Sequence, residues 1–240
     1  MKGSCDFKGL VDRCSRLRTA IILVICLGLS ASACGKAPAP EVEPVRLSVE
    51  EARTLIREEL LEEEPDLDLE ITLEERTPDD LWQRMGAQLF LSGGPFAEVR
   101  SAETYAVADG QVDRLGIAFG GHGVTSTEIA DLNQDGEPEL LYTYSWGSGL
   151  HRSHVAVYMP RHPDERTIDA DLVYLNGDML LEKVDDQTVF VKAGYGYGDD
   201  FVVAATLGPL RLEDQGGQVA LVVDLEEELP PEVMRQITLP

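Results

Sequence analysis

The chain has 240 residues and carries 44 acidic against 20 basic side chains, a formal net charge of −24 at pH 7. Nucleic acids and anionic lipid surfaces are bound through basic patches, so this composition argues against nucleic acid as a partner. The four cysteines all stand near the start of the chain, at Cys5, Cys14, Cys26 and Cys34. Later residues therefore cannot form a disulfide among themselves, and their stability must come from a hydrophobic core.

Residues 1–33 have the layout of a cleaved secretory signal. Basic residues precede the apolar run Ala20–Leu29, which is too short to cross a bilayer as a stable helix, and small residues lead into Cys34. The segment Leu-Ser-Ala-Ser-Ala-Cys that ends at Cys34 resembles the lipobox of bacterial lipoproteins. This resemblance implies that Cys34 is lipidated and becomes the mature N-terminus. The alternatives are ordinary cleavage near Ala33 or an uncleaved membrane anchor.

A tether follows the predicted signal. Residues 34–46 are rich in proline, alanine and glutamate, which predicts a stiff spacer before a single β-rich domain over residues 47–240. Gly35 stands where an aspartate would signal retention in the inner membrane, so the resemblance favours the outer membrane. The sequence thus predicts an exported protein that contacts the bacterial cell envelope through lipid on Cys34.

Two helices are expected after the tether. Ser48-Val-Glu-Glu51 is a capping box that begins a helix to about Glu63, with apolar residues at helical spacing. The stretch Leu67–Leu73 has the pattern of a strand. A second helix is expected to run to about Met85, with Thr77 as its N-cap and proline in its first turn.

From about residue 87 onward, short apolar runs separated by turn residues predict strands. Asp109-Gly110 and Asn176-Gly177 predict hairpins, and Gly208-Pro209 predicts a break between strands. The expected strands are Tyr105–Val107, Val112–Phe119, Val124–Ala130, Leu140–Ser145, His154–Met159, Leu172–Leu175, Met179–Val184, Val189–Ala193, Phe201–Leu207, Leu210–Leu212 and Val219–Val223. A short helix at Pro231–Ile237 completes the pattern.

These elements predict an α+β fold that is mainly β, an antiparallel sheet assembly with two N-terminal helices. A β-sandwich or a partial β-propeller-like arrangement are the alternative forms of the sheets.

Residues 131–139 have the pattern of a cation-binding loop. Asp-Leu-Asn-Gln-Asp-Gly-Glu-Pro-Glu places side-chain oxygens at positions 1, 3, 5 and 9 and a glycine at position 6. Calcium takes roughly six to eight oxygen ligands. The expected donors are Asp131, Asn133, Asp135, Glu139 and the main-chain carbonyl of Glu137. An EF-hand is excluded because position 12 is Tyr142 and the flanking residues favour strands. An acidic turn that binds no metal is the alternative.

The stretch Ile129–Tyr142 resembles the calcium loop of FG-GAP and VCBS repeats, in which Asp-x-Asn-x-Asp-Gly-x-x-Asp links two strands. The resemblance implies a structural Ca²⁺ ion in a β-rich domain. Gln134 stands where the family usually has glycine, and Glu139 where it usually has aspartate. A propeller needs several copies of such a repeat, and only one occurs here, so we do not expect a whole propeller.

A second candidate site combines histidines with a tryptophan. All the histidines of the chain fall between His122 and His162. The residues proposed for a ligand site or a second metal site are His122, Trp146, His151 and His154. Zinc is not expected, because residues three apart in an extended segment point to opposite faces. The strand Leu140–Tyr144 should place the loop that contains Trp146 and His151 at the end of the sheet opposite to the cation loop.

The polar loops offer three further candidate sites. A serine hydrolase would use Ser148 or Ser153, but the strand-turn-helix nucleophile motif is missing. Tyr195 and Tyr197 alternate with glycine and would stack on a sugar or peptide if they are exposed. Asp199 and Asp200 would belong to a glycosidase-like carboxylate pair. In the plainest interpretation, these loops have structural roles only.

Together these patterns predict a cell-envelope lipoprotein with a structural calcium loop that acts as a binding or interaction module for a protein or glycan. The alternative is an envelope hydrolase or metal-dependent enzyme that uses His122, His151 and His154.

Overall fold

The computed structural model describes residues 45–63, 71–93, 103–117, 119–147, 149–162, 165–196 and 198–239. The predicted signal, Cys34 and most of the tether lie outside these ranges. Residues Glu43–Pro240 belong to one compact unit. Within the described ranges, no helix combines the length and the apolar character that crossing a membrane requires.

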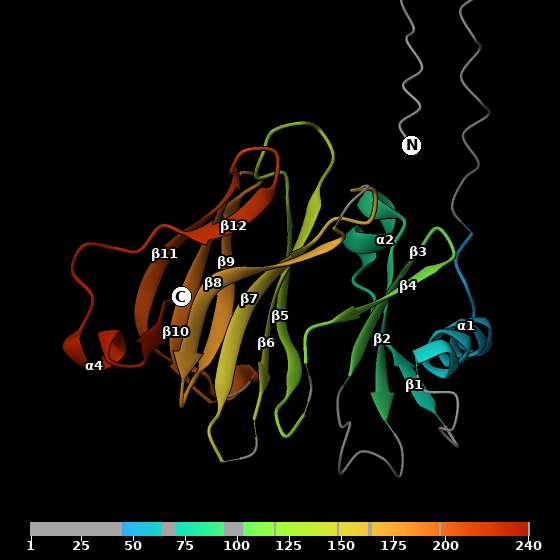
Figure 1. Ribbon diagram of the computed structural model, residues 1–240, viewed down its shortest axis with the longest axis horizontal. Coiled ribbons are helices and arrows are strands. Elements are labelled where there is room, and N and C mark those ends of the chain that lie inside the picture. Colours follow the sequence, from blue (N-terminus) through green and yellow to red (C-terminus); the bar gives the residue numbers. More distant parts are fainter. Residues whose placement is uncertain are drawn as a thin grey trace, which may run out of the picture. The chain divides into compact units, whose positions relative to one another are not determined.

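The described chain contains three antiparallel sheets (Figure 1). The N-terminal sheet has the order β1-β2-β3-β4, with β1 at Thr72–Glu75, β2 at Gln88–Gly93, β3 at Thr104–Ala108 and β4 at Gln111–Leu115. The central sheet has the order β13-β8-β7-β6-β5, with β5 at Gly123–Ala130, β6 at Glu139–Trp146, β7 at Arg152–Tyr158, β8 at Thr167–Leu175 and β13 at Ile237–Thr238. The C-terminal sheet has the order β12-β11-β10-β9, with β9 at Asp178–Asp185, β10 at Thr188–Tyr195, β11 at Val202–Asp214 and β12 at Val219–Val223.

In the part of the chain that the structure describes, the helices are α1 (Val49–Glu63), α2 (Asp79–Met85) and α4 (Pro231–Met234), and η1 (Gly198–Asp200) is a 3-10 turn. The prediction of a mainly β fold with antiparallel sheets and two N-terminal helices is therefore confirmed. The capping box also forms, because Glu51 N donates to Ser48 Oγ at 3.3 Å and Ser48 N donates to Glu51 Oε2 at 2.8 Å.

Two helix boundaries differ from the prediction. Pro78, not Thr77, is the N-cap of α2, because the Thr77 hydroxyl instead accepts a hydrogen bond from Leu89 N on β2 at 2.9 Å. Helix α4 ends at Met234, short of the predicted Ile237, because Ile237 pairs with Tyr174 of the central sheet.

Two turn predictions were wrong. Asp109-Gly110 does connect the paired strands β3 and β4, but Asn176-Gly177 carries the chain from β8 in the central sheet to β9 in the C-terminal sheet. Gly208-Pro209 lies inside the continuous strand β11, at the point where its pairing passes from β10 to β12. A register shift in the β10–β11 ladder accommodates this change of partner.

The central sheet has a hydrophobic core on each face. Leu140, Tyr142 and Tyr144 of β6 belong to a core shared with the N-terminal sheet and α2, whereas Leu141 belongs to a core shared with the C-terminal sheet. This division follows from strand geometry, because successive side chains point to opposite faces. Since both faces are covered, β6 is buried along nearly its whole length.

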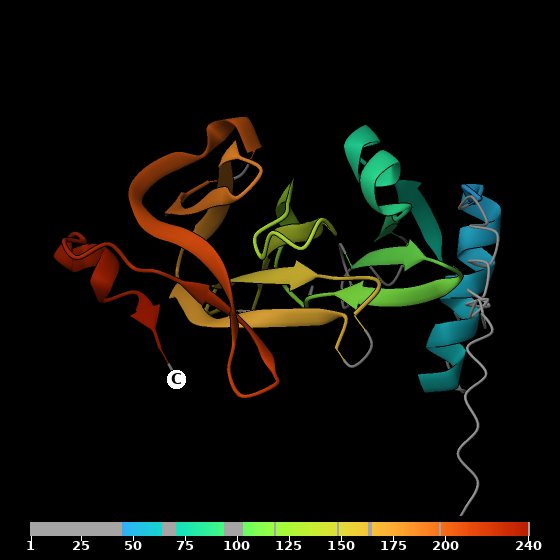
Figure 2. The same cartoon turned by 90° about the horizontal axis from the view of Figure 1, so that it is seen from above.

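A third core lies on the other face of the N-terminal sheet, beneath α1. Ala52 and Ile56 of α1 pack there with Phe90 of β2 and Tyr105 of β3. Figure 2 shows α1 beside the N-terminal strands, on the side away from the C-terminus. The sheets and α1 thus form successive layers, and the sheet that carries the candidate cation loop is enclosed between the other two.

The contact between Gly116 and Tyr144 gives a test of this packing. Gly116 has φ +72°, and a Cβ there would lie 2.4 Å from the Tyr144 ring, whereas Gly110 has φ +75° and no atom within 4 Å of such a Cβ. Gly110→Ala should therefore lower the free energy of unfolding by about 1 kcal/mol through backbone strain alone. Gly116→Ala should lower the free energy of unfolding by ~1–3 kcal/mol more than Gly110→Ala does, because the added methyl group overpacks against Tyr144. Urea denaturation measures both, and equal losses would contradict the packing described.

Candidate metal centre and histidine loop

The candidate cation loop joins the antiparallel strands β5 and β6 of the central sheet. Two of its residues have positive φ, Gln134 at 61° and Gly136 at 89°. Gln134 thus adopts the left-handed conformation, which glycine would adopt with less strain. Gly136 allows the chain to turn back toward β6.

Main-chain N–H groups hold the loop side chains in place. Asp131 accepts hydrogen bonds from Asp135 N and Gly136 N, both at 3.1 Å, through its two carboxylate oxygens. Asp135 accepts one from Glu137 N at 2.7 Å, and the Asn133 side-chain oxygen accepts one from Asp135 N at 3.0 Å. As a result, carboxylate oxygens of Asp131, Asp135 and Glu139 lie within 4.8 Å of one another.

Glu139 is the most unusual of these residues because it is only 2% exposed. Its Oε2 accepts a hydrogen bond from Leu132 N at 2.9 Å. Burial, reinforced by the negative charges of Asp135 and Asp131, raises the pKa of Glu139 to about 7. Among the described residues, no lysine or arginine forms an ion pair with the three carboxylates, so the cluster has no positive partner from the protein.

The start of the loop is attached to two other parts of the fold. Asp131 N donates to the main-chain oxygen of Asp186, in the turn between β9 and β10, at 2.7 Å. The Arg84 guanidinium of α2 binds both carboxylate oxygens of Asp186, at 2.8 and 2.9 Å, and the Ile129 carbonyl at 3.3 Å. Lys183 also contacts Asp186 and the Ile129 carbonyl. Sequence reasoning missed these residues, which are far from the loop along the chain.

The donor set fits Ca²⁺ better than other common ions. All the donors are oxygens, whereas zinc prefers nitrogen and sulfur ligands. Magnesium usually retains several waters and demands near-octahedral geometry, while calcium accepts a flexible shell of roughly six to eight oxygens. The side chains of Asp131, Asn133, Asp135 and Glu139 and the Glu137 carbonyl would hold the ion. An ion here would supply the positive charge that buried Glu139 lacks.

The second candidate site separates into two pairs of residues. Trp146 Nε1 donates to His154 Nε2 at 3.1 Å, and the His154 ring stacks on Tyr144 with centroids 4.9 Å apart. Burial lowers the pKa of His154. This histidine therefore accepts a hydrogen bond as a neutral ring and is half-buried against the rings of Tyr144 and Trp146, which is a structural role.

The other pair is His122 and His151, whose ring centroids lie 5.9 Å apart. His151 Nε2 lies 2.6 Å from a carboxylate oxygen of Asp178, which is only 8% exposed. These residues line a cavity of about 310 Å³ together with Tyr195. Sequence reasoning missed Asp178. The predicted hairpin at Asn176-Gly177 would pair β9 with β8, whereas β9 belongs to another sheet and brings Asp178 to His151.

The remaining candidates have separate surroundings. Ser153 is fully buried, and its hydroxyl accepts a hydrogen bond from Met179 N at 3.1 Å. Asp199 and Asp200 are exposed in η1. Tyr195 is 44% exposed, with its hydroxyl 3.2 Å from the Gln236 side chain. Ser148 and Tyr197 lie outside the described residues.

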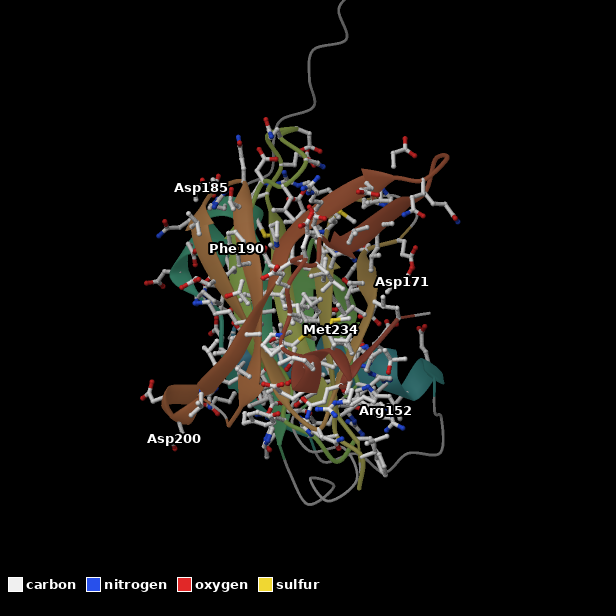
Figure 3. All side chains as sticks on the ribbon, turned by 90° about the vertical axis from the view of Figure 1, so that its left-hand side faces the viewer. Arg152, Asp171, Asp185, Phe190, Asp200 and Met234 are labelled. Carbon is white, nitrogen blue, oxygen red and sulfur yellow. The ribbon has the colours of Figure 1, made fainter. Side chains whose placement is uncertain are left out.

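The two candidate sites lie at opposite ends of the sheets, as expected. Glu139 and Trp146 are the two ends of β6, which pairs with β5 on one side and β7 on the other. Figure 3 shows Asp185 at the upper end of the view, next to the turn that contacts the cation loop. Arg152, the first residue of β7 and the neighbour of His151, is at the lower end. The histidines of the loop are thus not ligands of an ion bound by residues 131–139.

Comparison of the chain with protein-family models, with curated proteins and with solved structures gave no match.

The pKa of Glu139 predicts how the stability of the metal-free protein varies with pH. Because the folded-state pKa of about 7 exceeds the reference value of 4.5, folding favours the protonated carboxyl. This contribution is fully present below the unfolded pKa and is lost as pH rises through the folded pKa. In the presence of a chelator, lowering the pH from about 8 to about 5 should raise the free energy of unfolding of the wild type by on the order of 2–3 kcal/mol more than that of Glu139→Gln.

Urea denaturation at several pH values, with chelator throughout, measures this difference. The Gln variant keeps the size of the side chain and removes its titration, so it controls for the other acidic groups. Parallel pH profiles for the two proteins would contradict the charge environment described for Glu139.

Proposed function

We propose that this protein is a lipoprotein of the bacterial cell envelope in which Ca²⁺, held by residues 131–139, stabilises a β-rich binding module. The observation that carries the calcium proposal is the buried Glu139 carboxylate, which lies beside Asp131 and Asp135 and forms no ion pair with a lysine or arginine of the described structure. Like charges this close are unfavourable at low dielectric unless a cation or a proton neutralises them. The ligand spacing, with its resemblance to FG-GAP and VCBS loops, supports calcium as the cation.

The location of the loop supports a structural role for the ion. Asp131 and Glu139 flank the loop between β5 and β6, and Asp131 is hydrogen bonded to the turn that joins β9 and β10. An ion held by both residues would link the ends of these strands at the point where Arg84 also attaches α2. Ion binding would stabilise the folded protein, because the three carboxylates repel one another when no ion is bound.

A binding role is favoured over an enzymatic one by the arrangement of the polar side chains. The histidines of the proposed enzyme alternative are divided between two separate groups: His154 contacts Trp146, whereas His151 contacts Asp178. Nucleophilic catalysis needs a nucleophile, a base and an orienting group in contact. Ser153 is enclosed in the interior and hydrogen bonded to β9, so it does not supply the nucleophile.

Export and anchoring are proposed from the sequence alone. The signal-like segment ends in a lipobox-like sequence at Cys34, and proline and glutamate follow it. Lipid on Cys34 would hold the domain at a membrane, with the outer membrane favoured by Gly35. The strongly acidic composition suits a soluble domain exposed to an ionic medium.

Calcium should raise the thermal midpoint of a soluble chain that begins at Lys36. At a calcium concentration about 100-fold above Kd the stabilisation is roughly 2.7 kcal/mol, which corresponds to about 5–10 °C for a domain of this size. Asp131→Ala combined with Asp135→Ala should remove most of this shift. Differential scanning calorimetry with calcium and with chelator measures it.

A matched control changes the same number of charges elsewhere. Asp199→Ala combined with Asp200→Ala removes two exposed carboxylates from η1, distant in sequence from the loop, and should leave the calcium-induced shift intact. If the loop double variant responds to calcium as strongly as this control does, the site is assigned to the wrong residues.

Cys34 should carry lipid. Cys34→Ser should leave an unprocessed precursor and abolish labelling by a fatty-acid analogue, because the acylated thiol is lost. Cys26→Ser should be processed and labelled like the wild type. Metabolic labelling followed by gel electrophoresis tests both variants. Undiminished labelling of Cys34→Ser would show that another residue carries the lipid.

A further inference from the structure

A cavity of about 240 Å³ lies between the cation loop and the turn that joins β7 and β8. Its lining has three chemical parts. Asp135, Glu137 and Glu139 form an acidic wall, while Met85, Met159 and Val219 provide apolar surface. Arg84, Arg161 and His162 add basic or titratable side chains. An apolar pocket with a few convergent polar groups is the usual form of a small-molecule site, and this volume suits a small ligand.

The two arginines have different roles. Arg84 is engaged by Asp186 through both of its terminal nitrogens. The Arg161 side chain is 58% exposed, and the one ion pair it forms within the described ranges places Glu137 Oε1 4.0 Å from its Nη1. That distance exceeds a hydrogen bond, so the Arg161 guanidinium retains donors for a ligand. A planar guanidinium recognises a carboxylate in a bidentate manner.

The acidic wall alone would repel an anion. This step rests on the proposed function, because Ca²⁺ in the loop would cancel two of the three negative charges of Asp131, Asp135 and Glu139 and would present a cation directly to an anionic oxygen. The loop offers oxygen ligands from five residues, whereas calcium accepts roughly six to eight oxygens. A coordination position therefore remains for a water or a ligand oxygen. Asp135 and Glu139 line the cavity, which places the ion site at the cavity wall.

We propose that this cavity binds a small organic carboxylate with an apolar chain, whose carboxylate lies between the bound Ca²⁺ and Arg161. The apolar chain would pack on Met85, Met159 and Val219. Methionine side chains are flexible and polarizable, so they adapt to chains of different shape. Calcium and the carboxylate would then bind cooperatively, and each would strengthen the binding of the other by the same factor.

The test uses octanoate as the probe and the soluble chain from Lys36 onward, which contains the whole compact unit Glu43–Pro240. Calcium alone is titrated first by calorimetry, and octanoate is then titrated with calcium and with chelator. We expect octanoate to bind at least tenfold more tightly with calcium present than with chelator. 1-Octanol, which has the same chain without the charge, should bind at least tenfold more weakly than octanoate. The methyl NMR signals of Met85 and Met159 should shift with octanoate.

Arg161→Gln should weaken octanoate binding at least tenfold and leave the affinity for calcium alone unchanged. Arg211→Gln is the matched control, since Arg211 is 59% exposed, pairs with Asp224 and is absent from the cavity lining. This control should bind octanoate like the wild type.

The outcomes separate the two proposals. Calcium binding without any octanoate binding would overturn the ligand site and leave the calcium loop standing. Octanoate binding that is equal with chelator, or equal in Arg161→Gln, would overturn the proposed mode of recognition. No calcium binding in the first titration would overturn the calcium loop itself, and the ligand site with it.

Discussion

The structure depends on a central sheet that is buried on both faces. Along β7, Val155 and Val157 pack against the C-terminal sheet, while Ala156 and Tyr158 pack against the N-terminal sheet. Because side chains alternate, each strand contributes to two cores. A shift of one residue in the pairing register would move every side chain of a strand to the opposite core. This requirement fixes the register of β5 to β8 and thereby the positions of both polar loops that leave the ends of β6.

The enclosed sheet includes large polar side chains, and their hydrogen bonds follow from this burial. Tyr144 donates to Asp169 at 2.9 Å, and Tyr158 donates to Asp113 at 3.1 Å. Burial raises the pKa of Asp113, an effect that the neighbouring Arg166 guanidinium opposes, with its Nη1 2.9 Å from the carboxylate. A buried polar group without a partner costs about 1–3 kcal/mol, so these contacts are required for the tyrosines to fill the core.

Glu139 contrasts with Asp113, because its carboxylate is buried beside those of Asp131 and Asp135 and, among the described residues, no lysine or arginine forms an ion pair with it. A proton or a metal ion is the remaining way to neutralise it, which is why the same residue determines both the pH dependence of the metal-free protein and the proposed calcium affinity. The cavity beside the loop connects this electrostatic feature to binding. Under the proposal, a cation there would offset part of the negative charge of the acidic wall and would offer a coordination position to an anionic oxygen.

The sequence by itself determined the features that depend on neighbours along the chain. The capping box at Ser48, the Asp109-Gly110 hairpin and the spacing of oxygen donors in residues 131–139 are local, because a few adjacent residues contain all the interacting groups. Contacts between distant segments were decided only by the tertiary structure. Asn176-Gly177 has the composition of a hairpin turn, yet it crosses between sheets, because the residues after it complete the core of the facing sheet. The approach of Asp178 to His151 and the burial of Glu139 arise in the same way, since which strands face each other depends on packing over the whole domain and is not encoded in any short segment.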